Sequence, residues 1–305
     1  MAMDQDFCCV DWGTSSFRLW HLSAAEKILN EKSSDQGMSR LSREEFEPVL
    51  ERHLSDLGIA ATTPVVVCGM AGAAQGWKNA PYLDVPTRLD GLFRGAIKVG
   101  TGNREVRILP GLAQIPPLSP DVIRGEETLL LGAKLNGLDN GLLCLPGTHS
   151  KWVKVEQGAV TSFSTVMTGE VFELVSKHST LSHFLGGASA GLEEQAAFCD
   201  AVAEAMEKPE AILSALFSIR AIPLLLGESE VSGMPARLSG LLIGSEVASM
   251  RSIVSDKVHL VSDGPLAAAY EKALGLAGLK IEKVNAREMV LAGLISAANA
   301  LWGKN

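Results

Sequence analysis

The sequence predicts an α/β protein built from two similar domains. Its 305 residues amount to about two domains of ordinary length, and 47% hydrophobic against 20% charged residues can fill two cores. Short β-rich runs alternate with longer amphipathic segments along the chain. The pattern Gly-Thr-x-Ser occurs at 13–16 and again at 147–150, each time between two strand-like runs. This internal repeat predicts that the two halves are built alike.

The first half opens with a predicted β-hairpin. Residues 7–12 and 17–22 are its strands, and the polar turn between them begins with glycine and exposes backbone N–H groups. Residues 43–57 have the apolar spacing of an amphipathic helix that Ser42 can cap. Residues 64–68 are then predicted to form a buried strand. The order of these elements indicates a strand-rich start followed by a covering helix.

The second half repeats this opening with a strand at 141–146, a polar turn at 147–150 and a returning strand at 151–155. Helices and strands then alternate to the end of the chain. The helices are predicted at 193–206, 237–253, 266–274 and 287–301, and the strands at 258–261 and 281–284.

Charge and targeting signals narrow the class of protein. A count of 27 Lys+Arg against 35 Asp+Glu gives a net charge of −8, which argues against binding nucleic acid through an overall basic field. The N-terminus lacks the basic and apolar regions of a signal peptide, and the apolar stretch 289–302 is too short to span a bilayer. Five scattered cysteines predict reduced core thiols. We expect a cytoplasmic protein with no nucleic-acid or membrane partner.

Asp11 and the turn after it carry the first candidate chemistry. A site that handles phosphate needs backbone donors at a glycine-led turn, hydroxyl groups and a carboxylate near a metal, and residues 11–16 supply all three. A carboxylate within an apolar strand is costly unless it is paired, hydrogen-bonded or close to a metal. The alternative is a plain hairpin whose polar turn binds no ligand.

The second turn, 147–150, lacks this carboxylate because Leu145 stands in the place of Asp11, and it is followed by the basic Lys151. Two turns of unequal charge could have different roles: one would face Mg²⁺ and the other would bind the nucleotide phosphates. Other nucleotide motifs are missing from the sequence: GxxxxGK[ST], a GxGxxG that opens a helix, and the protein-kinase signatures. A hairpin-type phosphate site therefore remains.

Six segments, in order along most of the chain, resemble a single family. They lie at 11–14, 68–72, 75–82, 124–128, 145–152 and 167–170. Together they are similar to the 2-dehydro-3-deoxygalactonokinases, which belong to the superfamily of sugar kinases, heat-shock chaperone ATPases and actin. The resemblance implies ATP- and Mg²⁺-dependent phosphorylation of 2-dehydro-3-deoxy-D-galactonate to its 6-phosphate, in D-galactonate catabolism.

The resemblance also implies the architecture. It predicts an α/β fold of two ribonuclease-H-like, or actin-like ATPase, domains, whose mixed five-stranded sheets face a central cleft. We call residues 13–16 the first phosphate turn and residues 147–150 the second phosphate turn. We expect the sugar-acid side and the first phosphate turn in residues 1–124. The second phosphate turn and the nucleotide side are then expected in residues 125–305.

Carried over residue by residue, the resemblance assigns the ATP contacts to both turns and to a later strand-to-helix turn. That later turn, 262–265, lacks the paired glycines of relatives. Asp11 is assigned to Mg²⁺. Gly244 belongs to a further candidate segment for the nucleotide side, 244–246, and His149 either contacts the γ-phosphate or only shapes its turn. The residues predicted to contact ATP are Gly13, Thr14, Ser15, Gly147, Thr148, His149, Ser150, Lys151, Gly244, Asp263 and Gly264.

The general base and the substrate contacts complete the predicted site. Glu126 and Glu127 begin a predicted helix where related sugar kinases carry an aspartate, so the catalytic carboxylates are this pair and Asp11. Alternatively, acids in a first helical turn only complement the helix dipole. The substrate residues are Gln75, Trp77, Tyr82 and Arg124, with Arg40 and Arg88 as further candidates to bind the carboxylate of the sugar acid.

Two other functions stay open at this point. One is a kinase for another sugar or another 2-keto-3-deoxy acid, because isomers that differ at one hydroxyl are told apart by a few hydrogen bonds. The other is a nucleotide-gated regulatory ATPase of the same fold. The expected partners are a sugar acid and ATP, and a homodimer is the candidate assembly.

Overall fold

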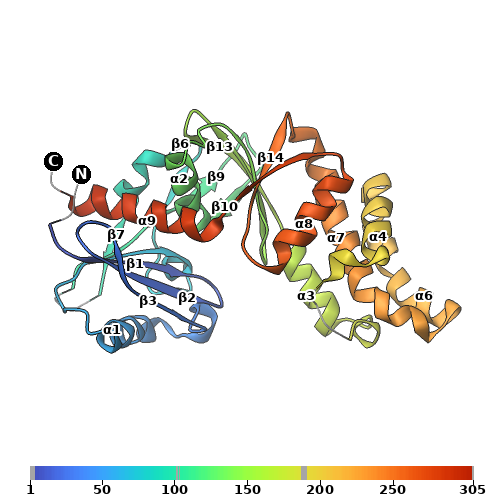
Figure 1. Ribbon diagram of the computed structural model, residues 1–305, viewed down its shortest axis with the longest axis horizontal. Helices are drawn as coiled ribbons and strands as arrows, with labels where there is room; N and C mark the ends of the chain where they lie inside the picture. The colour runs from blue at the N-terminus through green and yellow to red at the C-terminus, as the bar shows by residue number, and fades with distance from the viewer. Residues whose placement is uncertain (1–3, 101, 103, 187–190, 304–305) are drawn as a thin grey trace. The chain divides into compact units, whose positions relative to one another are not determined.

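The computed structural model describes residues 4–100, 102, 104–186 and 191–303, which group into two units. The first unit contains the chain up to residue 140, residues 155–162, and the chain from residue 286 onward. The second contains residues 141–154 and 163–285. A mixed β-sheet forms the centre of each unit (Figure 1).

The sheet of the first unit has the strand order β3-β2-β1-β4-β8-β7. The strands β1, β2 and β3 are antiparallel neighbours, while β1, β4 and β8 run parallel. A separate small sheet has the order β10-β9-β5. The strands are β1 (Phe7–Trp12), β2 (Phe17–Leu22), β3 (Ile28–Ser34), β4 (Val65–Gly69), β5 (Tyr82–Asp84), β6 (Thr87–Arg88), β7 (Ile97–Val99), β8 (Val106–Ile108), β9 (Gly111–Gln114) and β10 (Asp121–Ile123).

Helices cover both faces of this sheet, because successive side chains of a strand point to opposite sides. Cys8 and Val10 of β1 belong to the cluster that contains Phe46 of α1. Their neighbours Phe7 and Cys9 belong to the cluster that contains residues of α9. Figure 1 accordingly shows α1 and α9 on opposite sides of β1 to β3. The helices of this unit are α1 (Phe46–Asp56), α2 (Glu126–Leu135) and α9 (Ala286–Trp302).

Two glycines let α2 and α9 touch through their backbones. A Cβ atom on Gly132 would lie 1.8 Å from the carbonyl oxygen of Met289, and one on Gly293 would lie 1.9 Å from that of Thr128. This packing ties α2 into the first unit, which therefore extends beyond residue 124, where the sequence analysis set the domain boundary. Local periodicity does not reveal the packing, because α9 is distant from α2 in the sequence.

The second unit repeats the strand order of the first. Its sheet runs β15-β14-β11-β12-β13, with β11, β14 and β15 parallel, which matches β8-β4-β1-β2-β3 strand for strand. Each five-strand set carries a sixth edge strand that the sequence analysis did not expect: β7 on β8, and β6 on Ala159 and Val160 of β13, which are residues of the first unit. The strands are β11 (Gly141–Leu145), β12 (Ser150–Glu156), β13 (Ala159–Val166), β14 (Lys257–Val261) and β15 (Lys280–Val284).

Three helices of the second unit pack on one core with its sheet. Phe198 of α4, Ile243 of α7 and Tyr270 of α8 share a cluster with Cys144 of β11. Figure 1 shows these helices gathered together. The helices are α3 (Thr168–His178), α4 (Ala196–Glu207), α5 (Ile212–Leu216), α6 (Ser218–Leu226), α7 (Met234–Met250) and α8 (Pro265–Leu276).

The structure confirms both hairpin openings and the later helices and strands within a few residues of their predicted ends. The predicted cap is also present: Ser42 forms a capping box with Glu45 at the turn that leads into α1. All five cysteines are free thiols, as expected. The sequence analysis did not predict the strands β3, β8 and β13, the helices α3, α5 and α6, or the small sheet, whose strands have only three or four residues.

The helices α5 and α6 carry an exposed apolar surface, which we call the α5–α6 patch. Its five large side chains are between 59% and 83% exposed. No single helix in the described part of the chain is long and apolar enough to cross a membrane, although the pair 209–216 and 218–226, bent by 50°, passes by length and composition together. The patch consists of Leu213, Phe217, Leu224, Leu225 and Leu226.

Candidate functional site

Asp11 lies near the end of β1, directly opposite Arg18 on β2. The Oδ2 atom of Asp11 accepts hydrogen bonds from Nε and Nη2 of Arg18, at 3.1 and 2.5 Å. The side chain of Asp11 is 16% exposed and that of Arg18 is 34% exposed. The ion pair therefore gives the carboxylate of Asp11 a partner, while part of this carboxylate still faces solvent. The partner offsets the free-energy cost of placing an acid in an apolar strand.

The first phosphate turn is held by its own backbone and by the segment that follows β3. The N–H of Gly13 donates to the carbonyl oxygen of Ser16, at 2.9 Å. The carbonyl oxygen of Thr14 accepts from both the N–H and the hydroxyl of Ser39, at 2.9 Å each. The side chains of Thr14 and Ser15 remain exposed. The turn is thus braced from one side and open to a ligand on the other.

Gly69, at the end of β4, brings Asp11 close to the start of α2. Gly69 has a φ of 90°, and a Cβ there would lie 2.6 Å from the carbonyl oxygen of Trp12 and 3.5 Å from Oδ1 of Asp11. A Cβ on Gly125 would in turn lie 3.2 Å from the Cα of Gly69. Three segments far apart in the sequence therefore meet at one glycine. The structure brings the carboxylates predicted to be catalytic to this place.

The two glutamates that begin α2 differ in their surroundings. Glu127 is 1% exposed, and its carboxylate accepts from the N–H of Gly125 at 2.6 Å and from the hydroxyl of Thr128 at 3.1 Å. Burial, followed by the charge of Glu126, raises the pKa of Glu127 to about 8. Glu126 is only partly buried, and it accepts from the N–H of Arg124 at 3.1 Å. Of the pair, Glu126 is the one whose side chain a ligand can approach.

Arg124 precedes these acids and is 8% exposed. Its Nη2 donates to the carbonyl oxygen of Ala80 at 2.9 Å, while Nε and Nη1 are buried without a partner among the described residues. The guanidinium lies 4.2 Å from the ring centre of Tyr82, which is 39% exposed. A buried guanidinium with unused donors is the group that an incoming carboxylate would satisfy.

The other two arginines are engaged elsewhere. Arg40 pairs with Asp35 and Arg88 pairs with Asp90, and all four side chains are largely exposed. Each pair is a surface ion pair of the first unit. Of the three arginines considered from the sequence, Arg124 is thus the one that the structure buries near the predicted catalytic acids.

Gln75 and Trp77 lie in the loop that follows β4. Gln75 is exposed. Trp77 is 9% exposed and its ring centre lies 6.3 Å from those of Trp12 and Phe46. The indole is thus part of the core of the first unit, where it anchors the loop. The packing of the core is therefore sufficient to explain an aromatic residue at position 77, and no contact with a ligand is required.

The second phosphate turn packs against the start of α3. A Cβ on Gly169 would lie 2.5 Å from the carbonyl oxygen of Gly147, so only glycine permits this approach. The carbonyl oxygen of Thr148 accepts from the N–H of Glu170 at 2.9 Å. The first turn of α3, with its N–H groups, therefore lies beside the phosphate turn.

The side chains of His149, in this turn, and of Lys151, directly after it, both have partners nearby. The ammonium group of Lys151 donates to the carbonyl oxygen of His149 at 2.7 Å, and the lysine is 9% exposed. Nε2 of His149 lies 2.5 Å from a carboxylate oxygen of Glu170, and both residues remain accessible. The basic side chain predicted to hold phosphate thus folds back along its own turn.

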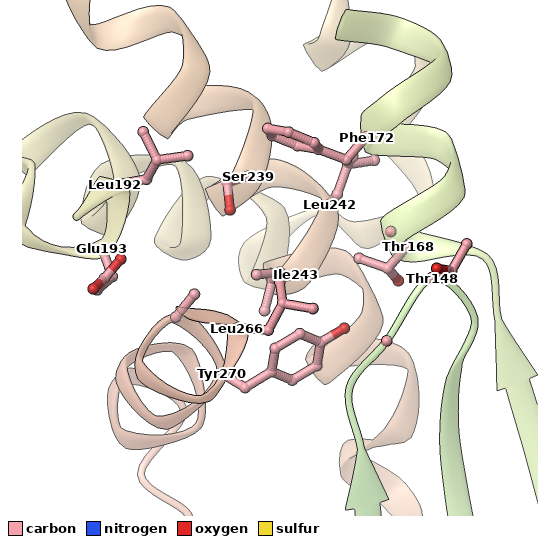
Figure 2. A pocket seen from close by; sticks show the side chains of 13 residues that line it. Thr148, Thr168, Phe172, Leu192, Glu193, Ser239, Leu242, Ile243, Leu266 and Tyr270 are labelled. Carbon is pink, nitrogen blue, oxygen red and sulfur yellow. The ribbon is translucent and has the colours of Figure 1, made fainter. Parts of the chain in front are cut away.

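A pocket of about 290 Å³ opens beside this turn, within the second unit. Figure 2 shows Thr148 and Thr168 at one side of the pocket, Glu193 at the opposite side, and apolar side chains between them. The pocket is thus polar at its ends and apolar along its length. It is lined by Gly147, Thr148, Thr168, Gly169, Phe172, Leu192, Glu193, Ser239, Leu242, Ile243, Leu266, Ala269 and Tyr270.

Glu246 of α7 lies behind this pocket and is 2% exposed. Its Oε1 accepts from the hydroxyl of Ser150 at 2.5 Å and from the indole N–H of Trp152 at 2.7 Å. Its Oε2 accepts from the hydroxyls of Thr168 and of Tyr270, the latter at 2.7 Å. We call these five residues the Glu246 cluster. The sequence analysis considered residues 244–246 for the nucleotide side but did not predict this cluster, although an acid in a largely apolar helix was a usable signal.

The turn predicted to contact the adenosine does lie between a strand and a helix. Gly264 has a φ of 90° and caps α8, and both Asp263 and Gly264 are exposed. The helix that follows this turn lines one part of the pocket, with Leu266, Ala269 and Tyr270. Gly244 faces elsewhere, because a Cβ there would lie 2.9 Å from the backbone of Val202 in α4. Gly244 therefore serves the packing of α7 on α4.

The residues present suit a single Mg²⁺ bound partly by its substrate. In the part of the chain that the structure describes, no three His, Cys, Asp or Glu side chains gather as a metal cluster. Mg²⁺ in phosphoryl-transfer sites is commonly held by one or two carboxylates together with substrate phosphates. Asp11, an oxygen donor beside a phosphate turn, fits that arrangement.

Comparisons with known proteins show the family of the chain. A family profile described as 2-keto-3-deoxy-galactonokinase matches residues 11–297. A curated protein of Rhizobium meliloti (strain 1021), named "Probable 2-dehydro-3-deoxygalactonokinase", is 44% identical over 299 residues, 97% of each chain. The 2-dehydro-3-deoxygalactonokinase of Escherichia coli (strain K12) is 36% identical over 306 residues, 98% of this chain and 99% of that one.

Solved structures show the same relationship. The crystal structure of a candidate 2-dehydro-3-deoxygalactonokinase from Sinorhizobium meliloti is 43% identical, covers 98% of both chains and has a TM-score of 0.93. The activator of 2-hydroxyisocaproyl-CoA dehydratase from Clostridium difficile has a TM-score of 0.53 at 12% identity, covering 97% of this chain and 96% of that one, which supports the fold alone. By its family match and these identities, the chain belongs to the 2-keto-3-deoxy-galactonokinase family of kinases.

Proposed function

We propose that this chain is an ATP- and Mg²⁺-dependent kinase of the cytoplasm. It transfers a phosphoryl group to the terminal hydroxyl of 2-dehydro-3-deoxy-D-galactonate and forms the 6-phosphate in D-galactonate catabolism. Family membership supports the reaction class and the acceptor. The single observation that supports ATP binding is the pocket beside the second phosphate turn. One side of this pocket is formed by the first residues of α3.

The chemistry of this pocket suits a nucleoside triphosphate. Its apolar walls, which include Leu242, Ile243 and Leu266, suit the face of a purine ring. Its polar side, formed by Thr148 and Thr168, lies beside the second phosphate turn and the first residues of α3, and the N-terminus of a helix attracts phosphate. The second unit is accordingly our candidate for the nucleotide side.

The first unit is our candidate for the sugar-acid side. Arg124 has two buried donors without a partner among the described residues, and the acceptor carries one carboxylate. Tyr82 lies over the guanidinium and is partly exposed, so its movement would open the way to that charge. We propose that Arg124 binds the carboxylate, and that Gln75 and Tyr82 contact hydroxyl groups.

Phosphoryl transfer asks the protein mainly for position and for neutralisation of charge. We propose that Glu126 accepts the proton of the attacking hydroxyl, because it is the more accessible of the two glutamates. Asp11 would hold Mg²⁺, which would supply charge neutralisation at the phosphate oxygens. Glu127, buried and bonded to the N–H of Gly125, would fix the first turn of α2.

A coupled assay of ADP release tests the proposed function directly. The acceptors are 2-dehydro-3-deoxy-D-galactonate, its gluconate epimer, glucose and none. We expect turnover with the galactonate compound and little with the others. Equal ADP release without an acceptor would instead identify a regulatory ATPase, and preference for another acceptor would keep the fold and change the substrate.

Glu126→Gln and Glu127→Gln separate the base from the acid that only supports the helix. Glu126→Gln should lower kcat by about 10²–10⁴-fold, the usual contribution of a general base, with both substrates still bound. Glu127→Gln should lower kcat far less, because its carboxylate is buried and accepts from Gly125 and Thr128 at the start of α2. The reverse order of effects would move the base to Glu127.

We also propose that the chain forms a homodimer through the α5–α6 patch. The largest apolar patch of a monomer normally covers about 300–600 Å², and five leucine and phenylalanine side chains exposed by 59% or more would form a large apolar centre. Buried against the same patch of a second copy, they would supply the core of a standard interface of about 800 Å² per partner. The exposed acids Glu228 and Glu230 after α6, with a net charge of −8, disfavour an anionic membrane as the occupant.

Leu225→Lys tests the dimer, because Leu225 is 81% exposed and its replacement costs the folded chain little. Light scattering after size-exclusion chromatography should give twice the 32.3 kDa chain mass for the wild type and one chain mass for the variant. Leu276→Lys, also on an exposed helical surface but outside the patch, is the control and should remain dimeric. A monomeric wild type would refute the dimer.

A further inference from the structure

We infer that Glu246 is a positioning residue for the nucleotide: its buried carboxylate joins the second phosphate turn, the start of α3 and α8 into one wall of the pocket. This inference rests on the proposed function, since it assigns a role within the nucleotide side. It goes further by naming an internal group that touches no ligand and yet controls ATP affinity.

The four donors come from three elements and converge on this one carboxylate. Ser150 and Trp152 lie on β12 directly after the phosphate turn, Thr168 is the first residue of α3, and Tyr270 lies on α8. Glu246 itself comes from α7. Four elements are thus connected through a single side chain, in addition to their apolar contacts.

Two of the donors are themselves part of the pocket wall. Thr168 and Tyr270 line the pocket, and Ser150 ends the turn that begins with Gly147. Gly169, next to Thr168, approaches the carbonyl oxygen of Gly147 closely. A shift of the Thr168 hydroxyl would therefore move the start of α3 relative to the phosphate turn, and with it the N–H groups that would hold phosphate.

The bonding pattern explains why an acid is needed here. The carboxylate accepts two hydrogen bonds on each oxygen, so all four donors find an acceptor in a place that water does not reach. Burial, and then the charge of Glu246, raises the pKa of Tyr270 well above its usual value, so the phenol keeps the proton that it donates. The indole N–H of Trp152 can only donate, so at least one acceptor is required at this point.

A role in stability alone is the competing explanation, and the two make different predictions. If the cluster only stabilises the second unit, removing a bond lowers Tm but leaves the KM values of the folded enzyme alone. If it positions the nucleotide wall, the KM for ATP rises while the KM for the sugar acid stays the same. The comparison of the two KM values therefore decides between them.

The test compares Glu246→Gln with wild type by steady-state kinetics in both substrates and by calorimetric titration with ADP. Glutamine keeps the size of the side chain and one carbonyl acceptor, but it loses the second acceptor and the charge. We expect the KM for ATP and the Kd for ADP to rise about tenfold or more, as for a lost set of buried hydrogen bonds. The KM for the sugar acid should stay within about twofold of wild type.

Tyr270→Phe is the second variant, and it keeps the test decisive if Glu246→Gln does not fold. It removes only the hydroxyl from the cluster and should raise the KM for ATP by several-fold. Glu271→Gln is the matched control, because Glu271 is the neighbour of Tyr270 on α8 and pairs with the exposed Lys283. It should leave both KM values unchanged.

The outcomes separate this inference from the proposed function. Folded Glu246→Gln and Tyr270→Phe enzymes with wild-type KM for ATP would overturn the positioning role, and so would a lower Tm as the sole effect. If wild type itself fails to bind ADP, the proposed nucleotide side is refuted first. Selective loss of nucleotide affinity in both variants would support the inference.

Discussion

The two phosphate turns follow the same strand order but place their carboxylates differently. Positions 134 residues apart correspond, so Asp11 and Arg18 of the first hairpin match Leu145 and Trp152 of the second. The first hairpin thus carries an ion pair across its two strands. The second carries apolar side chains there, and the nearby acid comes from a helix instead. A shared hairpin therefore does not imply a shared electrostatic site.

The burial of the acids completes this comparison. Asp11 keeps part of its carboxylate accessible, which suits a group that meets Mg²⁺ or substrate. Glu246 is enclosed by four donors and can act only through the residues that it holds. The acid of the first hairpin therefore stays partly accessible, whereas the acid beside the second hairpin is internal. Changes in the first unit should alter catalysis and acid binding, and changes in the second should alter ATP affinity.

Asp11→Asn should produce the largest effect on activity. It removes the accessible carboxylate and leaves Arg18 without its partner, so kcat/KM should fall by about 10²-fold or more, as for loss of a group that stabilises developing charge. Binding of ADP, measured by calorimetry, should persist. Leu145→Met at the matching position is the control, since a volume-conserving change in the core should leave activity nearly intact. An Asp11→Asn variant with the kcat/KM of wild type would contradict a catalytic role for the acid of the first hairpin.

Glu127→Gln should change the pH dependence of stability by an amount on the order of a few kcal/mol. The pKa of Glu127 is raised from 4.5 to about 8, so its contribution is fully present below pH 4.5 and is lost as pH rises towards 8. Urea unfolding of both proteins at several pH values measures this. The stability of wild type relative to the variant should fall between those limits and level off above them. A constant difference would show that Glu127 does not titrate in this range.

Gly169→Ala should raise the KM for ATP by about tenfold and leave the KM for the sugar acid unchanged. The new Cβ would lie 2.5 Å from the carbonyl oxygen of Gly147, which forces α3 away from the phosphate turn. Gly275→Ala provides the control, because a Cβ at that helical position meets nothing within 4 Å. Steady-state kinetics in each substrate distinguishes the two results. Equal changes in both KM values would mean that the effect is not confined to the nucleotide side.

Arg124→Lys should have the smallest effect of the four, a rise in the KM for the sugar acid of several-fold to about tenfold. Lysine keeps the charge but loses the forked donors and the stacking on Tyr82. Arg88→Lys is the control, since Arg88 pairs with Asp90 on the surface. The KM for ATP should not move in either variant. An unchanged KM for the acid in Arg124→Lys would remove Arg124 from the substrate side.

Much of the fold was predictable because its signals are local. Alternating apolar residues and a glycine-led turn identify both hairpins, and the spacing of Phe46, Leu50 and Leu54 identifies α1. The short strands of the small sheet have too few residues to show a period. The extent of the first unit depends on the backbone contact of Gly132 with Met289, which no local pattern contains.

By itself, the sequence determined the class of the protein: an α/β fold with a repeated phosphate hairpin, an acid at position 11 and the motifs of one kinase family. The tertiary structure decided the surroundings of the acids. It buried Glu127, left Glu126 accessible, and surrounded Glu246 with donors from β12, α3 and α8. The physical reason is that periodicity and turn chemistry act over a few residues, whereas burial and hydrogen-bond partners depend on segments that meet only in the folded chain.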